Sequence, residues 1–298
     1  MLNNLDDQNQ YDTRTNMSKP TQEQFEAFQK RINKELLNHP VILDNKYCKW
    51  FNDAELNLDD ARHFGVQFSV FSNLFLIAQI KKMINSVSID EMRSAKEILA
   101  NELGVIFNLS NKESAESVEN RKANKETEGD PKYVNTEGSV EGGKFRFKAA
   151  HFEWLVEFGK PLGLRFNDMG KRKFGTKGTL FFCDELERLY GSENYNTGAA
   201  ASYAVENWAA AGFWKQLVNG LKNYKDKSMH DLKIHFFTWH DKVEGNHALH
   251  TQEELKELYF GENGIQEDEF IIRGNEMLDG VQAFWDDLNQ ERLSRGRA

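Results

Sequence analysis

The long apolar segment at residues 58–86 constrains the fold of this chain most strongly. It reads "LDDARHFGVQFSVFSNLFLIAQIKKMINS", and its hydrophobic residues nearly encircle a helix of 3.6 residues per turn. A helix that is apolar on almost every face is stable in water only when other elements surround it. We therefore predict a helix here, capped by Asp59 or Asp60, in the middle of a helical bundle.

The helical pattern recurs along most of the chain. The segment "SKPTQEQFEAFQKRINKELLNHP" begins a helix with Ser18 or Thr21 as its cap, and Ser88 and Glu91 form a capping-box pattern ahead of another. Further apolar helical segments occupy residues 149–163, 176–191, 197–224, 236–250 and 267–291. No segment shows a convincing strand alternation. The sequence predicts an all-α bundle of about seven helices.

The distribution of polar residues predicts the domain organisation. We expect a disordered polar tail at 1–20, one helical domain at 21–290 and a flexible end at 291–298. Residues 110–144 crowd charges of both signs together and contain almost no large aliphatic residue. Such a segment buries too little apolar area to offset the entropy of ordering. It is predicted to be a surface insertion, either a passive loop or one that orders over a bound substrate.

Composition excludes several classes of function. The chain has 298 residues and a net charge of −9, which argues against a nucleic-acid partner. Its two cysteines, Cys48 and Cys183, have no paired spacing, which favours a reducing compartment and argues against a thiolate metal site. The polar N-terminus is no signal peptide, and no apolar run is long enough to span a membrane. We expect a soluble cytoplasmic protein.

A triplet in "FFTWHDKVEGNHALH", residues 236–250, is the first candidate for a functional site. His240, Glu244 and His247 have spacings of four and three, which puts them within about 60° of one another on a helix face. Two imidazoles and a carboxylate suit iron, manganese or zinc. The order differs from the H-E-x-x-H of zinc proteases. The alternative is a surface helix that happens to carry these residues.

A carboxylate in an apolar helix is the second candidate. Glu206 lies in the middle of "AAASYAVENWAAAGFW", with Ser202 and Ala210 one turn away on either side. Neither neighbour can pair with a charge, and a carboxylate buried without a partner is costly or becomes protonated. Binding a cation would remove that cost. An edge position or an interhelical pair with an arginine is the alternative.

Two further residues extend the set. His151 is at the head of the apolar helix in "KAAHFEWLVEFGKPLGL", and Glu102 ends another in "AKEILANELGVIF". With Glu206 and the triplet they give three carboxylates and three imidazoles from four helices. That is the kind of ligand set with which helical bundles bind two iron or manganese ions. Glu141, in the soft segment before His151, is the alternative acid to Glu102.

The order of these motifs resembles the haem-oxygenase-like diiron oxidase family, the iron-containing redox enzymes. The resemblance rests on "NELG", a histidine helix ending in "PLGL", a helix with one glutamate, the triplet and a closing "MLDGVQAFWDDL". It covers residues 25–290 and implies a seven-helix haem-oxygenase-like fold without haem. Carried over by position, the implied ligands are Glu102, His151, Glu206, His240, Glu244 and His247. Glu244 stands where the family commonly has an aspartate, so metal spacing could differ.

The resemblance also implies an activity. The expected cofactor is two iron ions, with manganese as the other metal, and O2 is the expected co-substrate. O2 activation through a peroxo-diferric species would oxidise a small amine-like or amino-acid-like substrate by N-oxygenation, desaturation or C–C cleavage. An external electron donor and a homodimer are left open. We further predict that His63, Gln67 and Trp208 line the substrate pocket.

Two other functions stay open from the sequence. One is a metal-free enzyme of the same fold, of the thiamine-salvage or quinone-cofactor type, in which the acids and histidines are polar pocket groups. The other is a helical interaction or carrier protein with a vestigial metal site, for which the charged insertion is the best support. Metal content separates both from the diiron enzyme.

Overall fold

The computed structural model describes residues 20–103, 140–141, 144–145, 150–243 and 247–295, and every structural statement below refers to these residues. The predicted tail at 1–20 lies outside them except for Pro20. The predicted insertion at 110–144 also lies outside them, except for Val140, Glu141 and Lys144, which form a short antiparallel ladder together with Phe145. Its strands are β1 (Val140–Glu141) and β2 (Lys144–Phe145).

The described chain is helical apart from this ladder, so the all-α prediction is confirmed. The helices are α1 (Gln22–Glu35), α2 (Pro40–Leu43), α3 (Lys46–Asp53), α4 (Leu58–Ile84), α5 (Ile89–Glu102), α7 (Ala150–Gly159), α8 (Lys177–Glu185), α9 (Tyr195–Ala209), α10 (Phe213–Lys227), α11 (His235–Val243), α12 (His247–Phe260) and α13 (Glu267–Arg295). Short 3-10 turns occupy Phe166–Asp168 (η1) and Arg172–Phe174 (η2), and a π-helix occupies Leu186–Tyr190 (η3).

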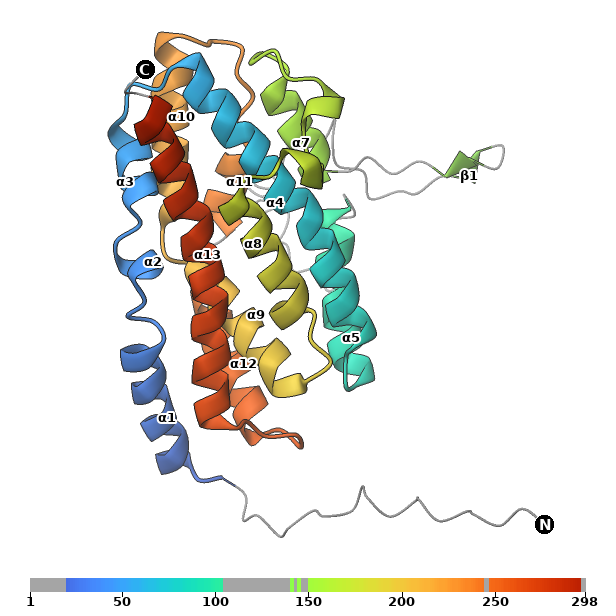
Figure 1. The fold of residues 1–298 in the computed structure, drawn as a ribbon. Coiled ribbons are helices and arrows are strands. Elements are labelled where there is room, and N and C mark those ends of the chain that lie inside the picture. Colours follow the sequence, from blue (N-terminus) through green and yellow to red (C-terminus); the bar gives the residue numbers. More distant parts are fainter. Residues whose placement is uncertain (1–19, 104–139, 142–143, 146–149, 244–246, 296–298) are drawn as a thin grey trace, which may run out of the picture.

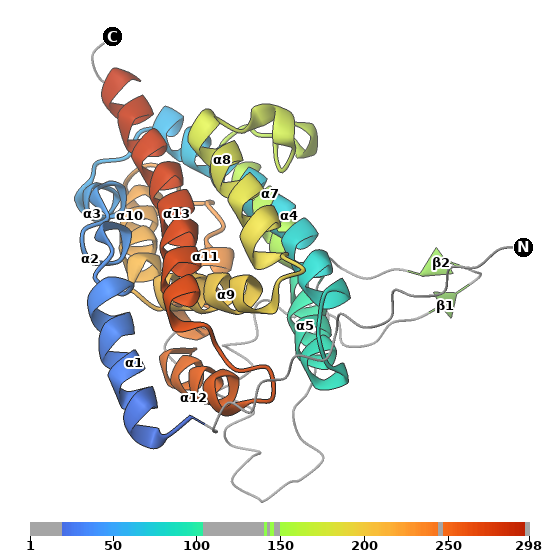
Figure 2. The same ribbon diagram turned by 60° about the horizontal axis from the view of Figure 1, so that its bottom comes forward.

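Two long helices organise the bundle (Figure 1). α13 packs against α8, α9 and α3, and α4 packs against α5, α7, α8 and η3. At one end α12 lies beside α1 (Figure 2), where Phe25 and Phe28 contact Tyr259 at ring-centroid distances of 5.2 and 5.4 Å. The bundle therefore brings together helices that are far apart in the sequence.

The predicted helix N-caps are observed at α1 and α5, but the prediction for α4 was wrong. Thr21 caps α1, as predicted for one of its two candidates, and the Glu91 amide donates to Ser88 Oγ at 3.1 Å. For α4 the prediction of Asp59 or Asp60 was wrong. Asn57 is the cap, because its side-chain oxygen accepts hydrogen bonds from the amides of both aspartates at 2.9 Å. The aspartates lie in the first turn of α4, where their charge is favourable.

One predicted helix is divided in the structure, and α2 and α3 match no predicted segment, so the described helices outnumber the seven expected. The predicted helix at 197–224 is split by Gly212, which has a φ of +86°, a left-handed conformation that glycine adopts without strain. The predicted helix at 236–250 corresponds to α11 and α12, which are described on either side of residues 244–246. Glu244 lies outside the described residues, so the helix face predicted for the triplet stays a prediction.

The predicted flexible end at 291–298 needs correction, because α13 continues to Arg295. Side chains of its last turns contact the rest of the bundle. The Arg292 guanidinium lies 4.2 Å from the ring centroid of Trp50, a favourable cation–π distance. Arg295 is 3.9 Å from Asp60 and 3.7 Å from Glu291. These contacts hold the last two turns against α3 and α4.

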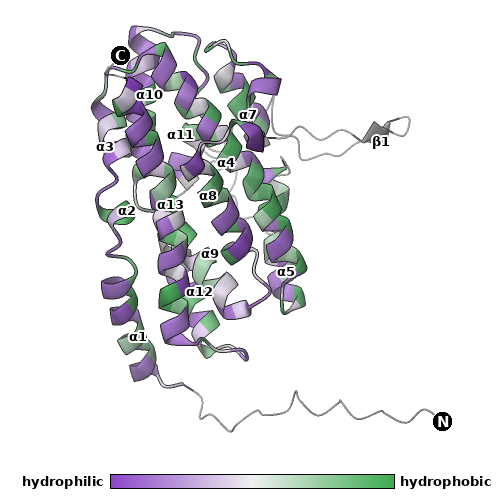
Figure 3. Cartoon of the chain, viewed as in Figure 1, coloured by the Kyte–Doolittle hydropathy of each residue, from purple (hydrophilic) through white to green (hydrophobic). Residues whose placement is uncertain are grey.

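The α4 helix is central but incompletely covered. No run long enough to span a membrane is expected from the sequence, but in the part of the chain described α4 is the one helix that is long and apolar enough to cross one by length and composition. Of its most apolar window, 56% is buried. Phe64 and Phe68 are fully enclosed by the bundle, as the sequence predicted for a central helix. The C-terminal half, beside α5, is also largely hydrophobic (Figure 3), and there Ile84 remains 64% exposed. That composition is typical of a core helix with one open side.

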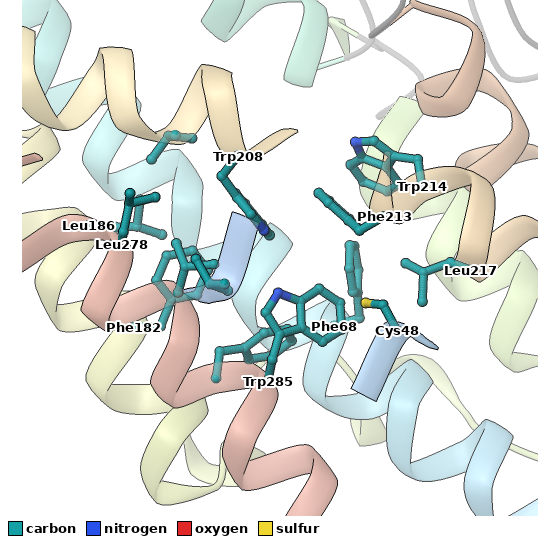
Figure 4. Close-up of a cluster of buried hydrophobic side chains, with 14 of the residues drawn as sticks. Cys48, Phe68, Phe182, Leu186, Trp208, Phe213, Trp214, Leu217, Leu278 and Trp285 are labelled. Carbon is teal, nitrogen blue, oxygen red and sulfur yellow. The ribbon is translucent and has the colours of Figure 1, made fainter. Parts of the chain in front are cut away.

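Aromatic rings fill the middle of the bundle (Figure 4). Trp208 of α9 stacks on Phe213 of α10 with ring centroids 4.7 Å apart, and Phe213 contacts Trp285 of α13 at 5.6 Å. Phe68 of α4 contacts Trp214 at 5.8 Å. Large rings from four helices thus interlock, which fixes the relative positions of α9, α10 and α11 around the histidines described next.

Candidate metal centre

Three of the six predicted ligands come together in the structure. Glu102 is the last residue of α5, His151 lies in the first turn of α7 and His240 lies in α11. Nδ1 of His151 is 2.7 Å from Oε2 of Glu102, and the rings of His151 and His240 have centroids 4.9 Å apart. Three helices that are remote in sequence therefore converge on one carboxylate and two imidazoles.

The contact between His151 and Glu102 orients the histidine ring. The imidazole is buried, and the carboxylate side chain is 15% exposed. A carboxylate accepts hydrogen bonds, so Nδ1 carries the proton and Nε2 keeps its lone pair. This is the arrangement in which a carboxylate positions a metal-binding histidine. Glu102 thus has an orienting contact in addition to the ligand role predicted for it.

His240 is fixed in a corresponding tautomer. Its Nδ1 lies 2.7 Å from the backbone oxygen of Phe236, one turn earlier in α11. A carbonyl oxygen can only accept, so Nδ1–H is the donor, and in the neutral ring Nε2 is the nitrogen without a proton. His240 also takes part in a further interaction within the chain. Both histidines therefore have Nε2 as the nitrogen that could bind a metal ion.

Aromatic side chains surround the two imidazoles. Trp214 stacks on His240 with centroids 4.5 Å apart and planes 19° apart, and Trp239 meets both rings, at 5.1 Å and 4.8 Å. Phe236 and Trp154 complete this wall. Rings packed in this way exclude water, and a low local dielectric strengthens electrostatic interactions inside the site.

The other predicted ligands are not brought to this position by the described residues. Glu244 lies outside them, and His247 begins α12 with its side chain outside the description. Within the described chain no three His, Cys, Asp or Glu side chains gather closely enough to hold a metal ion, and this includes Glu102, His151 and His240. Glu141, the alternative acid, belongs to β1, which lies away from the helices in Figures 1 and 2. The structure therefore favours Glu102 over Glu141 as the neighbour of His151.

The surroundings of Glu206 correct one premise of the sequence argument. Glu206 is half-buried and takes part in an interaction within the chain. One turn earlier on α9, Ser202 accepts a 2.5 Å hydrogen bond from Nζ of Lys82 in α4. Burial raises the pKa of Tyr190, and the charge of Glu206 raises it further. The absence of a partner along its own helix therefore did not leave Glu206 isolated, because other helices supply polar neighbours.

Gln67 and Trp208 were predicted to line a substrate pocket, but one is hydrogen-bonded to a neighbouring segment and the other lies in the aromatic core. Gln67 donates to the backbone oxygen of Phe174 and accepts from Thr176 N and Thr179 Oγ1, each at 2.9 Å. These bonds use its amide to fasten the segment before α8 onto α4. Trp208 belongs to the aromatic core, although its Nε1–H has no acceptor among the described residues. Of the two, only Trp208 keeps a free polar atom for a ligand.

The third such residue, His63, faces charged groups near the end of α13. Its Nε2 lies 2.6 Å from Oε2 of Glu291, but neither ring nitrogen makes a well-directed hydrogen bond within the described chain. Burial lowers the pKa of His63 below its usual value of 6.5, and Arg295 acts in the same direction. Glu291 and Asp287 oppose this shift. Burial is the largest effect, so the folded protein favours the neutral ring.

This environment predicts an acid-sensitive contribution to stability. The unfolded chain protonates His63 near pH 6.5 and the folded chain only at lower pH, so protonation favours unfolding as the pH falls through this window. The His63→Gln variant should therefore lose less stability than the wild type between about pH 7 and pH 5.5. Urea unfolding at both pH values measures this. The exposed His230→Gln variant is the control, and an equal loss in His63→Gln and the wild type would refute the assignment.

Two contributors to the site were missed from the sequence. Trp214 stacks on His240 from α10, and nothing in its local pattern indicates that contact, which depends on how α10 packs against α11. The Phe236 carbonyl was detectable in principle, because it lies four residues before His240 in a helix. A histidine at that spacing can take the carbonyl as its partner.

Comparisons with known proteins add no identification. No protein-family model matches the chain, and no curated protein matches it. The haem-oxygenase-like fold and the family resemblance therefore stay predictions, while the all-helical architecture is established.

Proposed function

We propose that this chain is an O2-dependent non-haem diiron oxidoreductase acting on a small amine-like or amino-acid-like substrate. The observation that carries the proposal is the convergence of Glu102, His151 and His240 from three separate helices. The sequence alone predicts all three as ligands. Their proximity supports a common role.

The donor chemistry of these residues fits an iron site. Imidazole nitrogens and carboxylate oxygens are ligands that iron and manganese accept, and an oxygen contacts Nδ1 of each imidazole and so orients the ring. Glu206, Glu244 and His247 would supply the rest of the ligand set. Once bound, the two ions would activate O2.

The protein's own contribution follows from the contacts. The Phe236 carbonyl holds His240 in the tautomer that a metal ligand needs, and Glu102 does the same for His151. The rings of Trp214 and Trp239 keep water away from both imidazoles, which protects a reactive oxidant from side reactions.

One observation favours a second candidate. The 2.7 Å contact between His151 and Glu102 is also the geometry of an acid–base pair, in which a carboxylate orients a histidine that moves protons. A metal-free enzyme would use the pair in this way. The two candidates differ in whether iron is needed for any reaction.

The experiment is O2 consumption by protein loaded anaerobically with Fe(II). We expect rapid O2 uptake with a transient visible absorption band, and amine or amino-acid substrates should speed the decay of that band. Protein mixed with O2 after chelation of the metal is the control. O2 uptake no faster than that of free iron in buffer would contradict the proposal. It would favour the second candidate, a metal-free enzyme that uses the acid–base pair.

A further inference from the structure

Three isoleucines form an exposed row on α4. Ile77, Ile80 and Ile84 are 42%, 43% and 64% exposed, and we call them the isoleucine seam. At 100° per residue they lie within about 60° of one another. Their spacing of three and four is the a–d–a spacing of a coiled-coil heptad.

The seam continues into other apolar surface. Val87 and Ile89, which follow α4 directly, are 48% and 62% exposed. On the side toward α8 the seam adjoins a groove of about 310 Å³. The groove is lined by Leu74, Ile77, Arg172, Cys183, Asp184 and Glu187. Exposed apolar residues therefore occur from the groove along α4 to the start of α5, which is unusual for a face that meets only water.

The rim of this groove carries balanced charges. Arg172 bonds Asp184 through two nitrogens, at 2.6 and 2.8 Å, and Lys81 Nζ lies 2.6 Å from Oε1 of Glu187. Both pairs are about half exposed. The rim thus has two cations and two anions, although the whole chain has a net charge of −9.

We propose that the isoleucine seam binds the seam of a second copy of this chain, α4 against α4, about a two-fold axis. In a two-fold interface the same patch lies on both subunits and must complement itself. β-Branched residues at a and d positions suit helix–helix packing. Because the rim charges are already paired within each copy, this face has no excess of either sign and avoids the repulsion that the net charge of −9 imposes elsewhere.

The small size of the isoleucine seam limits the expected affinity of the dimer. Stable interfaces bury about 1,200–2,000 Å² in total, and a seam of three isoleucines with its groove is a modest part of such an area. A dimer with a Kd on the order of micromolar follows. The inference does not depend on the metal site, because no residue of the seam belongs to it.

Analytical ultracentrifugation of the full chain tests the proposed dimer. At protein concentrations up to about 100 μM, a dimer with a micromolar Kd would be almost fully formed. The wild type should dimerise. Ile80→Glu and Ile80→Lys should each weaken association at least about tenfold, because a charge at the seam would be buried without a partner. Near the two-fold axis Ile80 faces its counterpart, so an equal mixture of the two variants should dimerise again. Ile272→Glu, at an isoleucine of α13 that is 56% exposed, is the matched control and should dimerise like the wild type.

Other results would overturn the proposal. A monomeric wild type over the whole concentration range contradicts it, as does a dimer that Ile80→Glu and Ile272→Glu weaken equally. A mixture of the Ile80 variants that stays monomeric, while the wild type dimerises, would place the seam away from the axis and contradict the α4–α4 arrangement. Circular dichroism of each variant shows that the bundle is retained.

Discussion

The His240→Ala variant should lose most of its affinity for Fe(II), by at least about a hundredfold, while its helical content stays unchanged. The imidazole is nine-tenths buried, and its tautomer is fixed by the Phe236 carbonyl so that Nε2 is presented as an acceptor. Alanine removes that donor atom and leaves a gap beside Trp214. Some stability is lost with the gap, but the backbone hydrogen bonds of α11 remain.

Anaerobic isothermal titration with Fe(II) measures this effect, and far-ultraviolet circular dichroism confirms the helices. His230→Ala changes an exposed histidine before α11 and is the matched control. Glu102→Gln separates the two roles of that residue. An orienting residue costs about 10–100-fold in metal affinity when changed, whereas loss of a direct ligand costs more. Normal iron affinity in His240→Ala would remove this histidine from the site.

The Gly220→Ala variant should be destabilised by about 3 kcal/mol. Gly220 lies in α10 where this helix packs against α3. A Cβ there would be 2.1 Å from the backbone oxygen of Phe51 and 2.7 Å from its ring. The carbonyl oxygen belongs to the backbone and cannot rotate away like a side chain, so the two helices must separate.

Gly198→Ala is the matched control, since it makes the same substitution inside α9. Its nearest atoms would be the backbone oxygens of Ser192 and Tyr190, at 3.7 and 3.8 Å, which is ordinary contact. Alanine should therefore stabilise α9 by about 0.5–1 kcal/mol through helix propensity. Urea denaturation of both variants measures the contrast. Equal stability of the two variants would show that α10 and α3 do not approach as closely as described.

Much of the helical architecture was predictable, because period and capping are local properties. The central position of α4 followed from its apolar residues, and Thr21 and Ser88 follow from cap chemistry. The break at Gly212 was missed because the apolar pattern continues across it. The last turns of α13 were missed because Trp50 and Asp60, which hold them, come from distant helices.

The candidate site was predictable in its residue types but not in its contacts. Sequence context singled out His151, His240 and Glu102, which the fold brings together. It misjudged the isolation of Glu206, because Lys82 and Tyr190 approach that face from elsewhere in the chain. It gave no sign that Gln67 is fully hydrogen-bonded to the segment before α8. Such pairings depend on tertiary packing, which periodicity does not encode.

The central claim is that this chain binds two iron ions through residues that include Glu102, His151 and His240. The most direct test is the number of Fe(II) ions bound per chain in an anaerobic titration of the purified protein, with and without candidate amine and amino-acid substrates. The account predicts two ions per chain, and none in a variant that lacks both histidines. One ion or none in the wild type under every condition would contradict the diiron centre.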